Sequence, residues 1–149
     1  MYLGVARLVG METAPLALSD DALLDALAQN FTDYDFHFIH FKAVDSRGED
    51  GDFGAKVKAI EAIDALVPRI EALKPDVLLV TGDHSTPSRM RAHSWHPVPV
   101  LIASQFTRPA PVNGFGERAC MQGDLGVFPA MHLMTLALAH AGRLAKFGA

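Results

Sequence analysis

Two short and almost entirely apolar segments, separated by a long amphipathic stretch, constrain the fold of this chain more than any other feature. Phe36–Phe41 and Val77–Val80 carry apolar or aromatic side chains at nearly every position, which is typical of strands buried on both faces of a parallel sheet. Between them, from Phe53 to Leu73, the apolar residues follow helical spacing. A strand, a helix and a strand in this order predict one right-handed βαβ unit.

The remaining elements extend this unit into a mixed fold. Ser19 followed by two acidic residues signals a helix start, and we expect Asp52 to cap the long helix and Pro68 to kink it. We also expect a helix at 1–10, a polar loop at 45–52, a strand at 98–103, an irregular region at 105–126 and a closing helix at 129–141. The sequence therefore predicts an α/β fold, a mostly parallel sheet with helices on both faces.

Composition excludes several classes of protein. The 149 residues are 50% hydrophobic and 20% charged with a net charge of −4, which is the balance of a globular domain. There is no basic stripe with interleaved aromatic residues, so we expect no nucleic-acid partner. No apolar run approaches the roughly 20 residues that cross a bilayer, so we expect no membrane partner. With Cys120 as its single cysteine and no apolar leader, the chain is expected to be cytoplasmic.

Metal-type ligands follow the first two predicted strands. Asp45 and Glu49 lie in the first loop, Asp83 and His84 lie in the second, and His93 comes before the third strand. Taken singly, such an aspartate usually caps a turn and such a histidine is usually exposed. Because ligands bind beyond the carboxyl ends of parallel strands, however, Asp45, Asp83, His84 and His93 are expected to converge. Oxygen and imidazole donors without thiolates suit a pair of divalent ions such as manganese, and such a pair favours phosphoryl transfer.

Specific motifs carry a family resemblance. The segment from Val80 to Pro87 reads Val-Thr-Gly-Asp-His-Ser-Thr-Pro and is followed by His93 and by Pro97-Val-Pro-Val100. Further motifs are Lys42-Ala-Val-Asp45, Asp50-Gly-Asp-Phe53 with Lys56, Gly123-Asp-Leu-Gly126 and the terminal Lys146-Phe-Gly-Ala149. Together they resemble the archaeal-type 2,3-bisphosphoglycerate-independent phosphoglycerate mutases of the alkaline phosphatase superfamily. The resemblance implies an isomerase of glycolysis and gluconeogenesis that interconverts 3-phosphoglycerate and 2-phosphoglycerate through a phosphoserine, with an alkaline-phosphatase-like core.

The resemblance also implies roles for individual residues. Asp45 and His93 match ligands of one metal ion, and Asp83 and His84 match ligands of the other. Glu49 stands where the family has a further histidine ligand, and a glutamate there is a harder donor that suits manganese or magnesium. Manganese is the expected metal, with magnesium, zinc and cobalt as alternatives. Lys42 resembles a substrate-binding lysine, although a solvated lysine at a strand end is an equally good interpretation.

The same resemblance implies that residues 1–149 are the C-terminal part of the metal-binding core. The family's nucleophilic serine and its inserted substrate domain would lie in segments absent here; Ser85 belongs to the metal-loop motif, so no catalytic nucleophile is assigned. We expect the chain to be inactive alone and to self-associate. Two alternatives remain open: a related metal-dependent phosphatase or phosphotransferase of the alkaline phosphatase superfamily, and a non-catalytic half that completes a separate chain.

Overall fold

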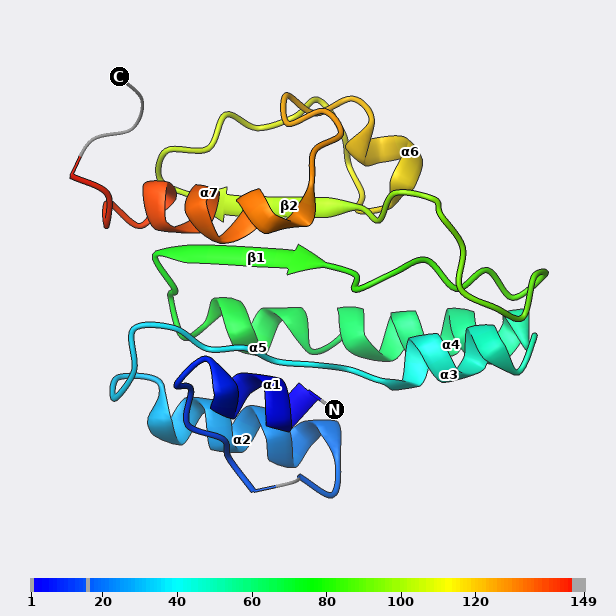
Figure 1. Ribbon diagram of the computed structural model, residues 1–149, viewed down its shortest axis with the longest axis horizontal. Helices are drawn as coiled ribbons and strands as arrows, with labels where there is room; N and C mark the ends of the chain where they lie inside the picture. The colour runs from blue at the N-terminus through cyan, green and yellow to red at the C-terminus, as the bar shows by residue number, and fades with distance from the viewer. Residues whose placement is uncertain (1, 16, 146–149) are drawn as a thin grey trace.

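The computed structural model describes residues 2–15 and 17–145 and shows helices arranged around a small sheet (Figure 1). The elements are α1 (Tyr2–Leu8), α2 (Asp20–Asn30), α3 (Ala43–Glu49), α4 (Phe53–Asp64), α5 (Val67–Glu71), β1 (Val77–Thr81), β2 (Val100–Ser104), α6 (Glu117–Cys120), the 3-10 helix η1 (Ala130–His132) and α7 (Leu133–His140). The mixed α/β class is confirmed. The predicted family terminus at 146–149 lies outside the described residues.

Local capping rules set where two of the helices begin. The Ser19 hydroxyl accepts a hydrogen bond from the backbone N–H of Ala22, and the Asp52 carboxylate accepts one from Ala55 at 2.8 Å. Both caps satisfy a backbone donor that the first helical turn would leave free. Pro68 lies at the first turn of α5, so it begins a new helix and does not kink a continuous one, as proline lacks the N–H that a helix interior needs.

The sheet within the described residues is formed by β1 and β2, which pair antiparallel from Val77↔Ser104 to Thr81↔Val100. The prediction of a mostly parallel sheet is therefore wrong for these strands. Continuous apolar runs indicate that a strand is covered on both faces, but they do not fix its direction. Here the chain between the two strands is a loop with no crossover helix, whereas a parallel pair is usually joined through a helix.

The first predicted strand, Phe36–Phe41, does not form a strand, so the predicted βαβ unit is wrong. It is not buried either, since Phe36 is 46% and Phe38 is 61% exposed. A strand needs a neighbour for its backbone donors and acceptors, and the described residues offer it none. The predicted loop after it contains α3. Asp45 and Glu49 therefore lie one turn apart on the same face of a helix.

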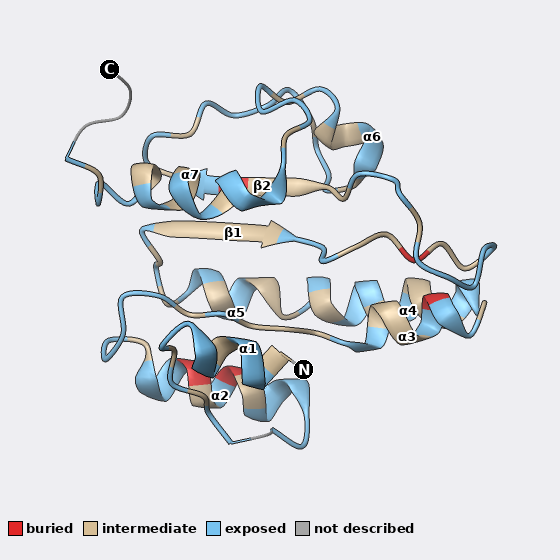
Figure 2. Cartoon of the chain, in the orientation of Figure 1, coloured by how far each residue is buried: buried red, intermediate tan, exposed pale blue. Residues whose placement is uncertain are grey.

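The described residues bury few side chains. Leu24 and Leu27 on α2 and Ile102 on β2 form the buried apolar set, and Figure 2 shows buried residues as isolated positions on several elements. The accessible surface is 11,200 Å², whereas a compact monomer of this mass, 16.1 kDa, would expose about 7,400 Å². The chain thus leaves apolar surface open. No helix within residues 2–15 and 17–145 is long and apolar enough to cross a membrane.

Candidate metal centre

Asp45 lies in the first turn of α3 and is held on both carboxylate oxygens. Its Oδ1 accepts a 2.6 Å hydrogen bond from the Thr86 hydroxyl, and its Oδ2 pairs with the Lys42 ammonium. Burial alone would raise the pKa of Asp45, but the hydrogen bonds from Lys42 and Thr86 and the Lys42 charge together lower it. The side chain is 17% exposed. Asp45 is therefore an ionised carboxylate whose Oδ1 atom faces the loop after β1, where Thr86 lies.

That loop supplies Asp83 and His84 directly after the end of β1. The Nε2 atom of His84 lies 3.6 Å from Oδ2 of Asp83, and its Nδ1 atom lies 3.1 Å from the Thr86 hydroxyl. The Tyr2 hydroxyl, from α1, donates a 2.7 Å hydrogen bond to Oδ2 of Asp83. This bond, with partial burial and the negative charge of Asp83, raises the pKa of Tyr2. Among the described residues, Asp83 is therefore hydrogen-bonded through Oδ2.

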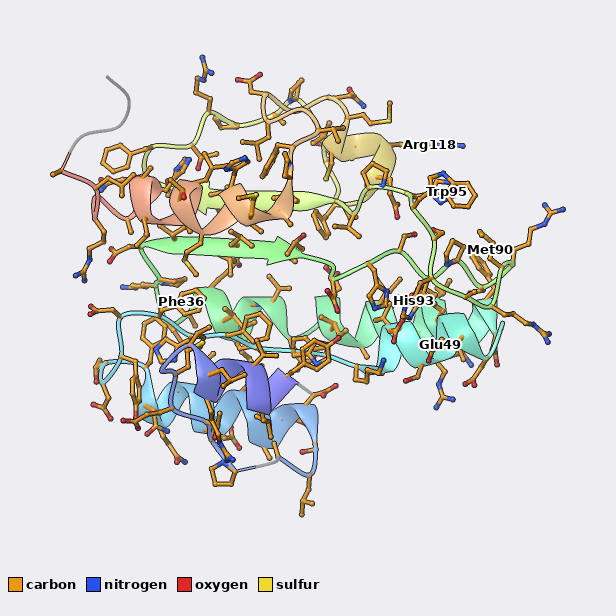
Figure 3. All side chains as sticks on the ribbon, viewed as in Figure 1. Phe36, Glu49, Met90, His93, Trp95 and Arg118 are labelled. Carbon is orange, nitrogen blue, oxygen red and sulfur yellow. The ribbon has the colours of Figure 1, made fainter. Side chains whose placement is uncertain are left out.

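His93 reaches the same place because the loop folds back on itself. Ser85 and Ser94 form an isolated antiparallel bridge, with Ser94 N donating to Ser85 O at 2.8 Å. The His84 and His93 rings consequently face each other with centroids 3.6 Å apart. Nε2 of His93 lies 3.5 Å from Oε1 of Glu49 and 3.7 Å from Oδ1 of Asp45. Figure 3 shows the His93 and Glu49 side chains next to each other.

The donor set fits a divalent cation. Asp45, His84 and His93 each place one ligand atom within 4.8 Å of the other two. Two donors bonded to one ion at about 2.1 Å are at most about 4.2 Å apart, so small side-chain shifts would close the set. Imidazole nitrogens with carboxylate oxygens and no thiolate form a borderline to hard donor set. Glu49 and Asp83 flank this group, each within 3.6 Å of a histidine nitrogen.

The structure thus brings all five candidate ligands together and adds Lys42 at the edge. The hydrogen bond from the Lys42 ammonium to Asp45 raises the pKa of Lys42, which stays cationic. From the sequence, no role was assigned to four residues that contact the candidate ligands or the loop that carries them: Tyr2, Gly48, Lys56 and Thr86. Lys56 and Thr86 belong to the family motifs, but nothing in their spacing indicated that they would meet the ligands.

Gly48 shows how closely α3 approaches the ligand loop. A Cβ atom at this position would lie 2.3 Å from the Thr86 carbonyl oxygen and 3.0 Å from the Lys56 ammonium. We expect Gly48→Ala to lower the free energy of unfolding by about 1–3 kcal/mol, because a backbone oxygen must move. The measurement is urea unfolding followed by circular dichroism.

Gly54→Ala on α4 is the matched control. Its nearest neighbour would be an Asp52 carboxylate oxygen at 3.6 Å, and alanine favours a helix over glycine by about 1 kcal/mol. This variant should therefore be as stable as the parent chain or slightly more so. If both variants unfold at the same urea concentration, α3 does not press on the Thr86 backbone as the structure indicates.

Several curated proteins are similar to this chain along its whole length. Over all 149 residues the chain is 52% identical to a Thermotoga neapolitana protein named "Probable 2,3-bisphosphoglycerate-independent phosphoglycerate mutase". A Thermus thermophilus protein and a Deinococcus radiodurans protein of the same name are 51% and 47% identical over 152 aligned residues and the whole of this chain. The chain spans 37% of the length of each of these relatives.

A solved structure supports the fold. The PH0037 protein from Pyrococcus horikoshii superposes with a TM-score of 0.91 at 34% sequence identity, over 98% of this chain and 47% of that one. The family model described as the metalloenzyme superfamily matches residues 9–140. That match contains every candidate ligand on α3 and on the loop after β1. The chain therefore belongs to the metalloenzyme superfamily.

Proposed function

We propose that this chain is the metal-binding part of a 2,3-bisphosphoglycerate-independent phosphoglycerate mutase. The observation that supports it most is the convergence of Asp45, His84 and His93 in a chain that is 52% identical, along its whole length, to a relative with the mutase name. The same name on relatives from three genera makes the phosphatase alternative the less favoured one. The substrates would be 3-phosphoglycerate and 2-phosphoglycerate, in the cytoplasm.

The family resemblance suggests how the ligands divide between two ions, and the distances are compatible with it. Asp45 and Glu49 both lie near Nε2 of His93, at 3.7 and 3.5 Å, and Asp83 lies near Nε2 of His84 at 3.6 Å. Asp45 also lies 3.8 Å from Nδ1 of His84, so the two groups adjoin. We assign Asp45, Glu49 and His93 to one ion and Asp83 and His84 to the other. Manganese is the expected metal. When bound, two such ions about 3.5–4 Å apart would neutralise the charge that develops on a transferring phosphoryl group.

Lys42 is assigned to the substrate. Its ammonium lies at the edge of the ligand group, its side chain is 55% exposed, and it pairs with Asp45. A cation on a flexible stem can pair with a phosphate or carboxylate oxygen through charge-assisted hydrogen bonds. The direct test of the whole proposal is conversion of 3-phosphoglycerate by a protein in which this chain replaces the matching part of a relative, as set out in the Discussion.

Metal titration tests the ligand assignment. Three protein ligands with water hold a divalent ion, whereas two offer little preorganisation to offset its dehydration. We therefore expect manganese, titrated by calorimetry, to fill the Asp45, Glu49 and His93 group first. His93→Ala should abolish the tighter binding event, and His84→Ala should leave it nearly intact. The reverse order of effects would show that the ligands are assigned to the wrong ions.

A further inference from the structure

Thr86 is a buried polar residue at the centre of the ligand group, and its backbone is held from two helices. It is 3% exposed. The Lys56 ammonium, from α4, donates a 2.6 Å hydrogen bond to its carbonyl oxygen. On α3, Gly48 approaches the same oxygen so closely that a Cβ would lie 2.3 Å from it. Thr86 therefore has little freedom to move relative to α3 and α4.

The Thr86 hydroxyl joins two candidate ligands that come from different segments. It donates a 2.6 Å hydrogen bond to Oδ1 of Asp45 and lies 3.1 Å from Nδ1 of His84. A hydroxyl carries one proton, and an ionised carboxylate can only accept. Because that proton is given to Asp45, the contact with His84 is a hydrogen bond only if Nδ1 carries the proton and donates it.

We infer that Thr86 is a positioning residue that fixes the tautomer of His84 and the orientation of Asp45. With its proton on Nδ1, neutral His84 keeps the lone pair of Nε2 free, on the side where Asp83 lies 3.6 Å away. Histidine ligands are commonly held in this way, with the second ring nitrogen donating to a neighbouring oxygen. One hydroxyl thereby aligns a ligand of each proposed ion, and in this respect the inference rests on the proposed function.

The first test needs no metal and reads the tautomer in the parent chain. Long-range ¹H–¹⁵N NMR of the full chain with ¹⁵N-labelled histidine, at about pH 8.5 where ordinary histidines are neutral, reports which ring nitrogen carries the proton. His84→Gln identifies the His84 signals by their loss. We expect Nδ1 of His84 to be protonated and Nε2 to be bare. A proton on Nε2 with a bare Nδ1 would overturn the inference.

The second test compares two substitutions of Thr86. Thr86→Val keeps the branched shape but removes the hydroxyl, so we expect the His84 tautomers to mix and manganese affinity to fall by about 10–100-fold. Thr86→Ser keeps the hydroxyl and should restore both. If Thr86→Ser and Thr86→Val lose the same affinity, or if Thr86→Val changes neither property, the hydroxyl has no positioning role.

Ser88→Ala is the matched control in the same loop, because the buried Ser88 hydroxyl has no hydrogen-bond partner among the described residues. It should leave both the tautomer and the affinity unchanged. If Thr86→Val fails to fold, as judged by circular dichroism, the tautomer of His84 measured in the parent chain still tests the inference. A chain with the expected tautomer that binds no manganese would refute the proposed metal centre and leave the Thr86 assignment intact.

Discussion

A chimera in which this chain replaces the matching part of the Thermotoga neapolitana relative is expected to convert 3-phosphoglycerate to 2-phosphoglycerate, whereas the 149-residue chain alone is not. The two sequences are 52% identical over the replaced segment, so the chimera should fold with the same contacts. The family resemblance implies that the nucleophilic serine comes from the remaining part of the longer protein. Transfer through an enzyme phosphate cannot proceed without that nucleophile.

The measurement is a coupled assay for 2-phosphoglycerate on both proteins with added manganese. Metal ions contribute several kcal/mol to such a transition state, so His93→Ala in the chimera should lower kcat by on the order of a hundredfold or more. Ser88→Ala in the chimera is the control and should retain activity. Turnover by the isolated chain above contamination level, or a folded and metal-loaded chimera without turnover, would contradict the proposed function.

The isolated chain is also expected to self-associate at micromolar concentration. Its accessible surface, 11,200 Å², is about one and a half times that of a compact monomer of its mass. Large apolar side chains such as Leu8, Leu18 and Val127 are more than four-fifths exposed. Each outer edge of the two-stranded sheet also lacks a strand neighbour within the described residues. Open apolar surface and unpaired strand edges both favour association.

Sedimentation velocity over a concentration series, with binding of a hydrophobic dye, measures this property. The sedimentation coefficient should rise with concentration and the dye should fluoresce. The chimera is the control, because the rest of the relative's chain is expected to cover the same surface and to reduce the dye signal. A strict monomer without dye binding would mean that the surface closes in solution in some other way.

The parts of the fold that obey local rules could be predicted from the sequence. The caps at Ser19 and Asp52 depend on residues three positions away. The apolar run at β1 was predicted as a strand, and it is one because β2 pairs with it. The prediction of a strand at Phe36–Phe41 was wrong because a strand depends on a neighbouring strand, which the segment's own sequence does not reveal. Helix α3 was missed because its glycine, Gly48, lowers helix propensity, although the close approach to Thr86 requires a residue without a side chain.

The candidate site also contains residues that could be predicted from the sequence and residues that could not. Carboxylates and imidazoles on the expected loops were predicted as ligands, and the structure brings them together, although their roles remain predictions. The hydroxyl of Thr86 could not be found, because its role depends on Asp45, which lies 41 positions away. A threonine has no distinctive chemistry until the fold gives it partners. The same holds for the Tyr2 hydroxyl, which meets Asp83 from 81 positions away.

The bridge between Ser85 and Ser94 has a consequence for how members of this superfamily are found. One backbone hydrogen bond closes the loop at its base and keeps the His84 and His93 rings adjacent, with centroids 3.6 Å apart. The tip around Met90 is exposed and supplies none of the candidate ligands. A change in the length of the tip is therefore expected to leave both imidazoles in place as long as the bridge forms. A search pattern anchored on the paired serines would tolerate such a change, whereas one that demands a fixed number of residues between the two histidines would not.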